Sequence, residues 1–387
     1  MEINFEQALQ YELAALAEQN LRRTLRSLTS PQGAQVSVGS QSYLNFSSND
    51  YLGLANHPKL VKAAQKALKE YGNGAGSARL ICGNLDTHTA LDQAIAHFKG
   101  TEAALSFSTG YAAAVGTIPA IVGRGDTVIL DKLAHASLID GARLSEARLR
   151  AFPHNNIAYL KKVLRQEKNA SRILIVTESI FSMDGDSGQL ADIVEVKENF
   201  GAWLMVDEAH ATGLYGRNRR GLVEQLGLSS KVEVQMGTLS KAMGSSGGYI
   251  AGSHSLINIL VNKARSFIYS TAPSPAVAAA SLAAVELVGG PEGEEQCAKL
   301  WKNVHYFAER LPARWKLSDV PQSPIFPLMI GDEGEALALS RSLEEKGFLV
   351  PAIRYPTVAR QQARLRVTLS AAHSTEQIDQ LLEHLTR

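Results

Sequence analysis

Residues 234–248 read VQMGTLSKAMGSSGG, and this stretch raises the first hypothesis about fold and chemistry. Its apolar first half ends in Gly237 and Thr238, as a buried strand ends before a loop. Its second half holds Lys241 among small residues. A lysine kept out of water loses its proton more easily, and a neutral amine attacks carbonyl groups. The alternative is a surface lysine in a flexible Gly/Ser loop, and the rest of the chain has to decide.

The composition is that of an ordinary globular protein, with 387 residues, 45% hydrophobic and 20% charged. A net charge of +1 gives no global basic field of the kind that binds nucleic acid. Cys82 and Cys297 are far apart, which argues against a disulfide framework and fits a reducing cytoplasm. The N-terminus is unlike a signal peptide, and no uncharged apolar run reaches the roughly 18 residues of a membrane helix. We therefore expect a cytoplasmic protein without membrane or nucleic-acid partners.

Between about residues 85 and 252, apolar runs typical of strands alternate with stretches of helical periodicity. This alternation predicts an α/β fold with a mostly parallel sheet covered by helices. Such sheets bind ligands at the carboxyl ends of their strands, so the chemistry is expected just after each run. The predicted strands are 103–107, 127–130, 149–152, 173–177, 202–206, 232–236 and 248–251.

The first 50 residues are predicted to form a separate segment. Four leucines at helical spacing predict a helix over 3–28, and the alternation over 33–46 predicts a short hairpin. The helix is expected to end in Arg22, Arg23 and Arg26. Cations suit the C-terminal end of a helix dipole, so the simplest interpretation of this basic cluster is structural.

Two further domains are predicted, a large one over 51–288 and a smaller α+β one over 289–387. Three arginines, Arg354, Arg364 and Arg366, interrupt the strands of the smaller domain. An arginine beside a cleft can fork onto a carboxylate, but a solvated arginine on an edge strand is the commoner case. The smaller domain is expected to contain helices 293–311, 334–346 and 375–385 and strands 325–330, 349–351 and 364–369.

Polar residues follow three of the predicted strands of the large domain. Gly110 and Tyr111 open a helix, whose free amides favour a phosphate group. His135 would usually be a capping or packed residue, but a ring in a strand-end loop can stack on an aromatic ligand. Ser182 lies in a polar loop whose acidic residues lack a full set of metal-liganding positions.

The strongest pair is Asp207 and His210, which follow the apolar run 202–206. A carboxylate that ends a buried strand needs a partner, or it takes up a proton. A pyridinium nitrogen is such a partner, and its ring can then drain electrons from a carbanion. The alternative is an aspartate that caps the following turn. Asp-x-x-His after one strand and Thr-x-x-Lys after the next favour pyridoxal phosphate (PLP), with Lys241 holding it as a Schiff base.

Six ordered motifs resemble those of the α-oxoamine synthases, PLP-dependent enzymes with the aspartate-aminotransferase-like fold. This resemblance covers the chain from about Arg22 to Leu385. It implies fold type I, with a mostly parallel seven-stranded sheet in a large domain and a smaller α+β C-terminal domain. The motifs are NDYLGL (49–54), HASL (135–138), SMDG (182–185), VDEAH (206–210), GTLSK (237–241) and RLRVTLSAAH (364–373).

The resemblance implies four catalytic residues. Lys241 would bind the cofactor covalently, Asp207 would pair with the ring nitrogen, His210 would reach the ring oxygen, and His135 would stack on the ring. The same resemblance implies that Ser270 and Thr271 reach the phosphate bound by a neighbouring subunit, so that a homodimer shares its active sites. The remaining cofactor contacts would be Gly110, Tyr111, Ser182 and Thr238.

The substrate residues carried over by the resemblance are Arg22, Asn49, His135, Thr357 and Arg366. Arg366 would hold the amino-acid carboxylate, and Arg22 and Thr357 would contact the acyl side. The motifs AIRYPTV (352–358) and LNFSSNDYLG (44–53) are most similar to members that condense L-alanine with pimeloyl-CoA or a pimeloyl acyl carrier protein.

Three alternatives stay open at this point. The runs RLICG (79–83) and GTL (237–239) are closer to relatives that use glycine, so condensation of glycine with acetyl-CoA is one. The second is an aminotransferase on the same fold. The third is a non-catalytic partner subunit, which would be expected to lack the lysine that this chain keeps at position 241.

Overall fold

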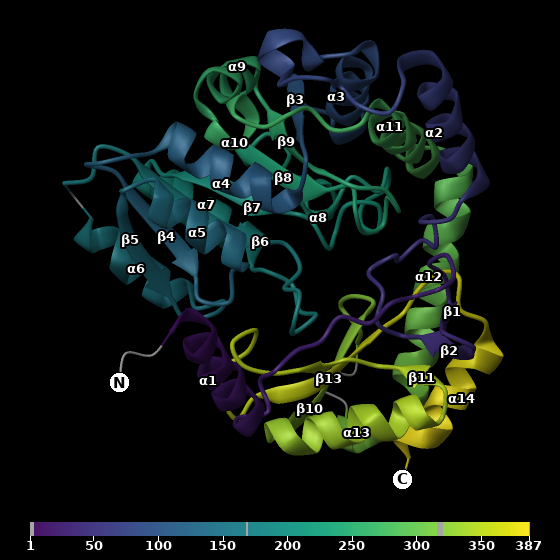
Figure 1. Ribbon diagram of the computed structural model, residues 1–387. Helices are drawn as coiled ribbons and strands as arrows, with labels where there is room; N and C mark the ends of the chain where they lie inside the picture. Colours follow the sequence, from purple (N-terminus) through teal and green to yellow (C-terminus); the bar gives the residue numbers. More distant parts are fainter. Residues whose placement is uncertain (1–3, 168, 316–319, 387) are drawn as a thin grey trace. The chain divides into compact units, whose positions relative to one another are not determined.

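The computed structural model describes residues 4–167, 169–315 and 320–386, which form two compact units (Figure 1). The larger unit comprises Asn49–Ser182 and Asp186–Trp301, and the other comprises Met1–Ser48, Met183–Gly185 and Lys302–Arg387. The N-terminal segment is thus grouped with the C-terminal residues. The domain boundaries drawn from the sequence stay predictions.

The larger unit is built on a seven-stranded sheet in the order β3-β9-β8-β7-β6-β4-β5. The strands from β8 to β5 run parallel, and only β9 is antiparallel, to both β3 and β8. This confirms the predicted α/β fold and its mostly parallel sheet. The strands are β3 (Ala103–Phe107), β4 (Thr127–Asp131), β5 (Arg148–Phe152), β6 (Ile173–Glu178), β7 (Trp203–Asp207), β8 (Val234–Thr238) and β9 (Gly248–Gly252).

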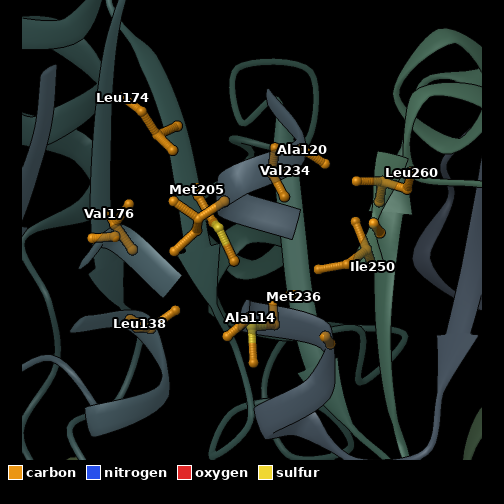
Figure 2. Packing of buried hydrophobic residues seen from close by; sticks show 14 of the residues in the cluster. Ala114, Ala120, Leu138, Leu174, Val176, Met205, Val234, Met236, Ile250 and Leu260 are labelled. Atoms are coloured by element: carbon orange, nitrogen blue, oxygen red, sulfur yellow. The ribbon is translucent and has the colours of Figure 1, made fainter. Parts of the chain in front are cut away.

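An apolar core lies between this sheet and its helices. Figure 2 shows Ala114 and Leu138, from two helices, beside strand residues such as Met205 and Ile250. All four are shielded from water, and burial of a large apolar side chain contributes about 1.5–3 kcal/mol. The helices are α2 (Pro58–Tyr71), α3 (Asp86–Lys99), α4 (Gly110–Ile121), α5 (Ala136–Leu144), α6 (Ile157–Gln166), α7 (Leu190–Phe200), α8 (Leu222–Gln225), α9 (His254–Lys263), α10 (Arg265–Ile268) and α11 (Pro275–Gly289), with a π-helical turn at Arg79–Gly83.

The other unit contains two three-stranded sheets, ordered β1-β2-β11 and β10-β13-β12. The predicted N-terminal hairpin is present, because β1 and β2 pair antiparallel from Gln35↔Leu44 to Val38↔Gln41. Helix α12 (Pro291–Arg310) begins in the larger unit and ends in this one. The other elements are α1 (Phe5–Glu18), β1 (Gln35–Val38), β2 (Gln41–Asn45), the 3-10 turn Ala313–Trp315, β10 (Ile325–Gly331), α13 (Glu333–Glu345), β11 (Phe348–Leu349), β12 (Ala352–Ile353), β13 (Ala363–Thr368) and α14 (Thr375–Leu385).

The predicted helix over 3–28 is wrong in its second half. Helix α1 ends at Glu18, and Asn20 takes a left-handed conformation with φ of 57°. Leu21 is buried outside the helix, and the arginines that follow lie in irregular chain. The Arg354 guanidinium holds this segment by donating to the carbonyls of Asn20 and Arg22, at 2.6 and 3.1 Å. Contacts with residues more than 300 positions away thus override the local leucine spacing.

The alternative of solvated edge arginines does not hold in the structure. Arg354, Arg364 and Arg366 are only 9%, 4% and 4% exposed. Arg364 donates to the Asp184 carboxylate at 2.7 Å, and Arg366 donates to the Thr368 hydroxyl at 3.0 Å. No helix in the described part of the chain is both long enough and apolar enough to cross a membrane.

Candidate functional site

A cavity of about 170 Å³ opens at the carboxyl ends of β6, β7 and β8. Glu178, Asp207 and Thr238, the last residues of these three strands, all line it. The cavity brings together seven of the residues predicted from the sequence, namely Gly110, Tyr111, His135, Asp207, His210, Thr238 and Lys241.

One wall of the cavity is the N-terminus of α4. Thr109 caps this helix by accepting a hydrogen bond from the Ala112 amide at 2.9 Å, and the helix begins at Gly110. A Cβ atom on Gly248 would come within 2.5 Å of the Gly110 Cα atom, so the start of the helix lies directly against β9. Free amides and a positive dipole end make this wall suited to a phosphate group.

Two hydroxyls lie at the end of β8. The Thr238 hydroxyl donates to the Gly247 carbonyl at 2.8 Å and shares a 2.7 Å hydrogen bond with the Ser240 hydroxyl. These bonds tie the end of β8 to the start of β9, and Lys241 follows directly in this loop. The lysine therefore reaches the cavity from a loop that is held at both ends.

His135 lies at the start of α5 and is fixed from two sides. Its backbone amide donates to the Glu178 carboxyl at 2.6 Å, and its Nδ1 atom lies 2.8 Å from the Ser137 hydroxyl. Burial lowers the pKa of the His135 ring, and the Lys241 charge lowers it further against the opposing effect of Asp207. The ring is therefore neutral near pH 7 and presents an uncharged face to the cavity.

Two carboxyl groups lie side by side in the sheet, because Glu178 and Asp207 are paired in the register of β6 and β7. Burial raises the pKa of Glu178 well above its usual range, and the Asp207 charge adds to this effect. Burial also raises the pKa of Asp207, while Lys241 and the Ala209 amide lower it. The Glu178 carboxyl is therefore harder to ionise than an ordinary glutamate, and Asp207 is the carboxyl that a cation in the cavity would stabilise.

His210 is oriented by Tyr51, whose hydroxyl lies 2.6 Å from the His210 Nδ1 atom. Tyr51 is completely buried, so this contact is shielded from water. The tyrosine belongs to the motif NDYLGL at the start of the larger unit. This contact, between residues 159 positions apart, explains why the motif matters to the site.

The cavity residues fit pyridoxal phosphate. Asp207 needs a cation, which a protonated pyridine nitrogen supplies, and the α4 N-terminus suits the phosphate. Lys241 offers an amine for the aldehyde, and His135 offers a flat neutral face for the ring. These are the four positions that the cofactor requires, and all four come from strand ends of one sheet.

A half-buried histidine outside the cavity connects the loops after β4 and β6. The His154 ring contacts Asp131 through Nδ1 at 3.1 Å and Asp186 through Nε2 at 2.7 Å. Asp131 ends β4 four residues before His135, and Asp186 follows Ser182 by four residues. Burial alone would lower the pKa of His154, but its hydrogen bonds to the two carboxylates outweigh this and raise the pKa to about 10.

The remaining predicted residues are not among those that line the cavity. Asn49, Ser182, Ser270 and Thr271 belong to the larger unit but lie outside the lining. Arg22, Thr357 and Arg366 belong to the other unit. The substrate roles implied for these residues stay predictions.

Sequence reasoning missed five lining residues, Ser137, Glu178, Ala209, Met236 and Ser240. Glu178 had a signal, because it directly follows the apolar run 173–177 as Asp207 follows 202–206. The acidic residues of this loop suggest metal ligands, but in the structure the Glu178 carboxyl accepts a hydrogen bond from the backbone amide of His135.

Comparisons with known proteins identify the family of this chain. The family model for aminotransferases of class I and II matches residues 41–385. An 8-amino-7-oxononanoate synthase of Geobacter sulfurreducens is 44% identical over 97% of this chain and 96% of its own length. The 8-amino-7-oxononanoate synthase 1 of Bacillus subtilis is 42% identical over 97% and 95%.

A solved structure is also similar to this chain over nearly its full length. It is a serine palmitoyltransferase from S. paucimobilis with PLP and myriocin bound, 28% identical, with a TM-score of 0.92. The match covers 98% of this chain and 96% of that one.

We predict that His154→Gln changes the pH dependence of stability. The folded pKa of about 10 lies above the unfolded value of about 6.5. The stabilisation is therefore complete below about pH 6.5 and is lost as the pH rises through about 10. The parent should lose unfolding free energy across this window relative to the variant, as measured by urea unfolding. His254→Gln, at an exposed histidine, is the control. If the unfolding free energy of the parent and of His154→Gln changed equally with pH, the stabilising contacts of His154 with Asp131 and Asp186 would be contradicted.

Gly248→Ala should weaken PLP binding roughly tenfold or more, because its Cβ would push the backbone of Gly110 out of place. Titration of the apoprotein with PLP, followed by absorbance, measures this. Gly74→Ala is the matched control, since no heavy atom lies within 4 Å of a Cβ at that position. Equal affinity in parent and Gly248→Ala would show that the start of α4 does not hold the phosphate.

Proposed function

The chain belongs to the aminotransferase class I and II family, and from this premise we propose that it condenses L-alanine with a pimeloyl thioester in biotin biosynthesis. The products are 8-amino-7-oxononanoate, CO2 and the free thiol of the carrier. The observation that carries this proposal is the cavity in which Lys241, Asp207, His135 and His210 lie together. Full-length relatives named 8-amino-7-oxononanoate synthase, 42–45% identical, support the choice of reaction.

The cofactor is pyridoxal phosphate, which supplies an electron sink for a carbanion next to an amine. Lys241 would hold its aldehyde, and the freed Nζ atom would then take the α-proton of alanine. Asp207 would keep a proton on the ring nitrogen, and His210 would meet the ring oxygen. The neutral His135 ring would cover one face and exclude water.

The bonds of the condensation balance without an external oxidant or reductant. The α-carbon of alanine forms a bond to the thioester carbonyl carbon, and the carbon–sulfur bond breaks to release the thiol. The resulting β-keto acid loses CO2, and a proton returns to the α-carbon. Lys241, in the loop between the tethered ends of β8 and β9, is the residue that we assign to both proton transfers.

The substrate residues of the proposal lie mostly in the unit that contains the C-terminus. Arg366 would bind the alanine carboxylate, and Arg22 and Thr357 would contact the acyl donor, with Asn49 near the substrate. Arg366 is 4% exposed, and its guanidinium donates to the Thr368 hydroxyl at 3.0 Å. A desolvated guanidinium of this kind suits a small carboxylate.

We extend the proposal to a homodimer with shared sites. Ser270 and Thr271 follow Tyr269, which is 71% exposed, and Thr271 bridges to Ala78 beside Ile81, which is 78% exposed. Large exposed apolar side chains of this kind are typical of a surface that a second copy covers. A cytoplasmic location and an acyl carrier protein as donor remain predictions.

The test of function is mass analysis of products from the PLP-loaded protein with each of three amino acids and two thioesters. Alanine with pimeloyl-CoA should give 8-amino-7-oxononanoate, whereas glycine with acetyl-CoA, or serine with either thioester, should give little product. Lys241→Ala should abolish turnover, and borohydride should attach no cofactor to it. A preference for glycine and acetyl-CoA would replace this proposal with the glycine-using alternative.

Asp207→Asn should still bind PLP but should exchange the α-proton of alanine much more slowly, by roughly 100-fold or more, because an amide does not hold the ring nitrogen protonated. Deuterium exchange followed by NMR measures this step without the acyl donor. Asp192→Asn, on the outward side of α7, is the control. Equal exchange rates in Asp207→Asn and the parent would remove this carboxylate from the mechanism.

A further inference from the structure

His373 ends the motif RLRVTLSAAH (364–373), and the proposed function gives this histidine no role. It lies between β13 and α14, in the unit that contains the C-terminus, and its side chain is only 2% exposed. Burial of an imidazole is costly unless both ring nitrogens have hydrogen-bond partners. The partners of this ring therefore identify what it holds in place.

Both ring nitrogens of His373 have backbone partners. The Nδ1 atom accepts a hydrogen bond from the Ser370 amide at 3.0 Å, so Nδ1 carries no proton. The Nε2 atom lies 3.0 Å from the Asn45 carbonyl oxygen and donates its proton to it. Burial lowers the pKa of His373 to about 4, against the opposing effect of the Asn45 carbonyl. The ring is therefore neutral near pH 7, in the one tautomer that satisfies both partners.

The turn that carries this ring is held by α12. The side-chain amide of Asn303 donates to the carbonyls of Ser370 and His373, at 3.0 and 2.9 Å. The His373 amide also donates to the Ser370 carbonyl, at 3.2 Å. The bond from Nε2 to Asn45 differs from these contacts, because it joins the turn to the end of β2, 328 positions away.

Phe46, directly after β2, lies against the His373 ring. The two rings stack with their centroids 4.3 Å apart and their planes 16° apart, and Phe46 is completely buried. The Phe46 carbonyl accepts a hydrogen bond from the Thr368 amide at 2.9 Å, and the Phe46 amide donates to the Leu349 carbonyl at 3.0 Å. His373 thus holds a residue whose backbone connects β11 to the last residue of β13.

The end of β13 also carries Arg366, which we assign to the alanine carboxylate. Arg366 and Thr368 are two positions apart in the strand, so their side chains lie on the same face. The Arg366 Nη1 atom donates to the Thr368 hydroxyl at 3.0 Å. The direction of the guanidinium therefore depends on the position of Thr368, which the Phe46 carbonyl holds.

We propose that His373 is a positioning residue for Arg366, an inference that rests on the proposed function. Through Phe46 and Thr368, the ring fixes the guanidinium in the direction from which it binds the carboxylate of the amino-acid substrate. Paired N–H donors bind a carboxylate well only in a defined geometry. A displacement of about 1 Å is enough to weaken such a contact strongly.

Two substitutions separate the two ring bonds. In His373→Gln the side-chain amide can replace Nε2 and donate to Asn45, whereas in His373→Asn the side-chain oxygen can replace Nδ1 and accept from Ser370 only. L-alanine is titrated into the PLP-loaded protein without an acyl donor, and binding is followed by absorbance. Affinity should fall about tenfold in His373→Asn and about threefold or less in His373→Gln.

PLP affinity of the apoprotein should stay at the parent value in both variants, because the residues that line the cavity around Lys241 belong to the larger unit. His305→Asn, at an exposed histidine of α12, is the control and should bind alanine as the parent does. Alanine affinity equal to the parent in His373→Asn overturns the proposal. An equal loss of PLP affinity also overturns it, because it would show a general loss of structure.

A double variant tests whether the effect passes through Arg366. Arg366→Lys keeps the charge but loses the paired donors, so alanine should bind more weakly but measurably. Adding His373→Asn to Arg366→Lys should weaken binding by less than about threefold more, since the two changes act on one contact. A further loss of about tenfold would show that His373 acts by another route and would overturn the proposal.

A separate variant covers the case in which His373→Asn does not fold. Phe46→Leu removes the ring stack and leaves the backbone bonds in place, and it should lower alanine affinity about threefold. Parent affinity in this variant would then overturn the proposal. Because alanine binding is measured without the acyl donor, failure of the condensation assay alone would count against the proposed function and not against the role of His373.

Discussion

The structure depends on one electrostatic constraint, the burial of the Asp207 carboxyl at the end of a central strand. A buried carboxylate is stable only beside a positive charge or several donors. The chain provides the Ala209 amide and the Lys241 charge, and burial raises the pKa of the neighbouring Glu178 carboxyl. The remaining stabilisation is left to a cation in the cavity. A protonated aromatic ring in the cavity would stabilise this buried carboxylate, and the carboxylate would in turn favour binding of that ring.

A second layer of contacts holds the residues that would touch the cofactor. Tyr51 orients His210, the Glu178 carboxyl holds the backbone of His135, and His154 joins the loops after β4 and β6. All of these contacts are made between groups of the protein itself, and they restrict the positions of the residues that would bind the cofactor. Because the pKa of His154 is raised to about 10, the stabilisation from its contacts changes with pH in the alkaline range.

Arginines organise the unit that contains the C-terminus. Arg354 ties the segment after α1 to the chain around β12, and Arg364 binds Asp184. The local pattern predicted a helix over 3–28, and the second half of that helix is absent because such long-range contacts fix the segment after α1. The leucine spacing describes only neighbours along one helix, whereas these guanidinium groups satisfy carbonyls and a carboxylate that lie about 180 to 330 positions away. Propensity is a weak guide where such long-range contacts decide the path of the chain.

The sequence by itself determined the strands of the large sheet and the seven cavity residues that follow them. A strand buried on both faces shows as a local apolar run, and the carboxyl ends of parallel strands converge on one edge. Only the tertiary structure decided the strand order, the reversal of β9, the raised pKa of Glu178 and the contacts of His154 with Asp131 and Asp186. Each of these depends on which distant residues share a buried environment. Burial and pairing between remote parts of the chain leave no periodic mark in the sequence, so they become visible only once the chain is folded.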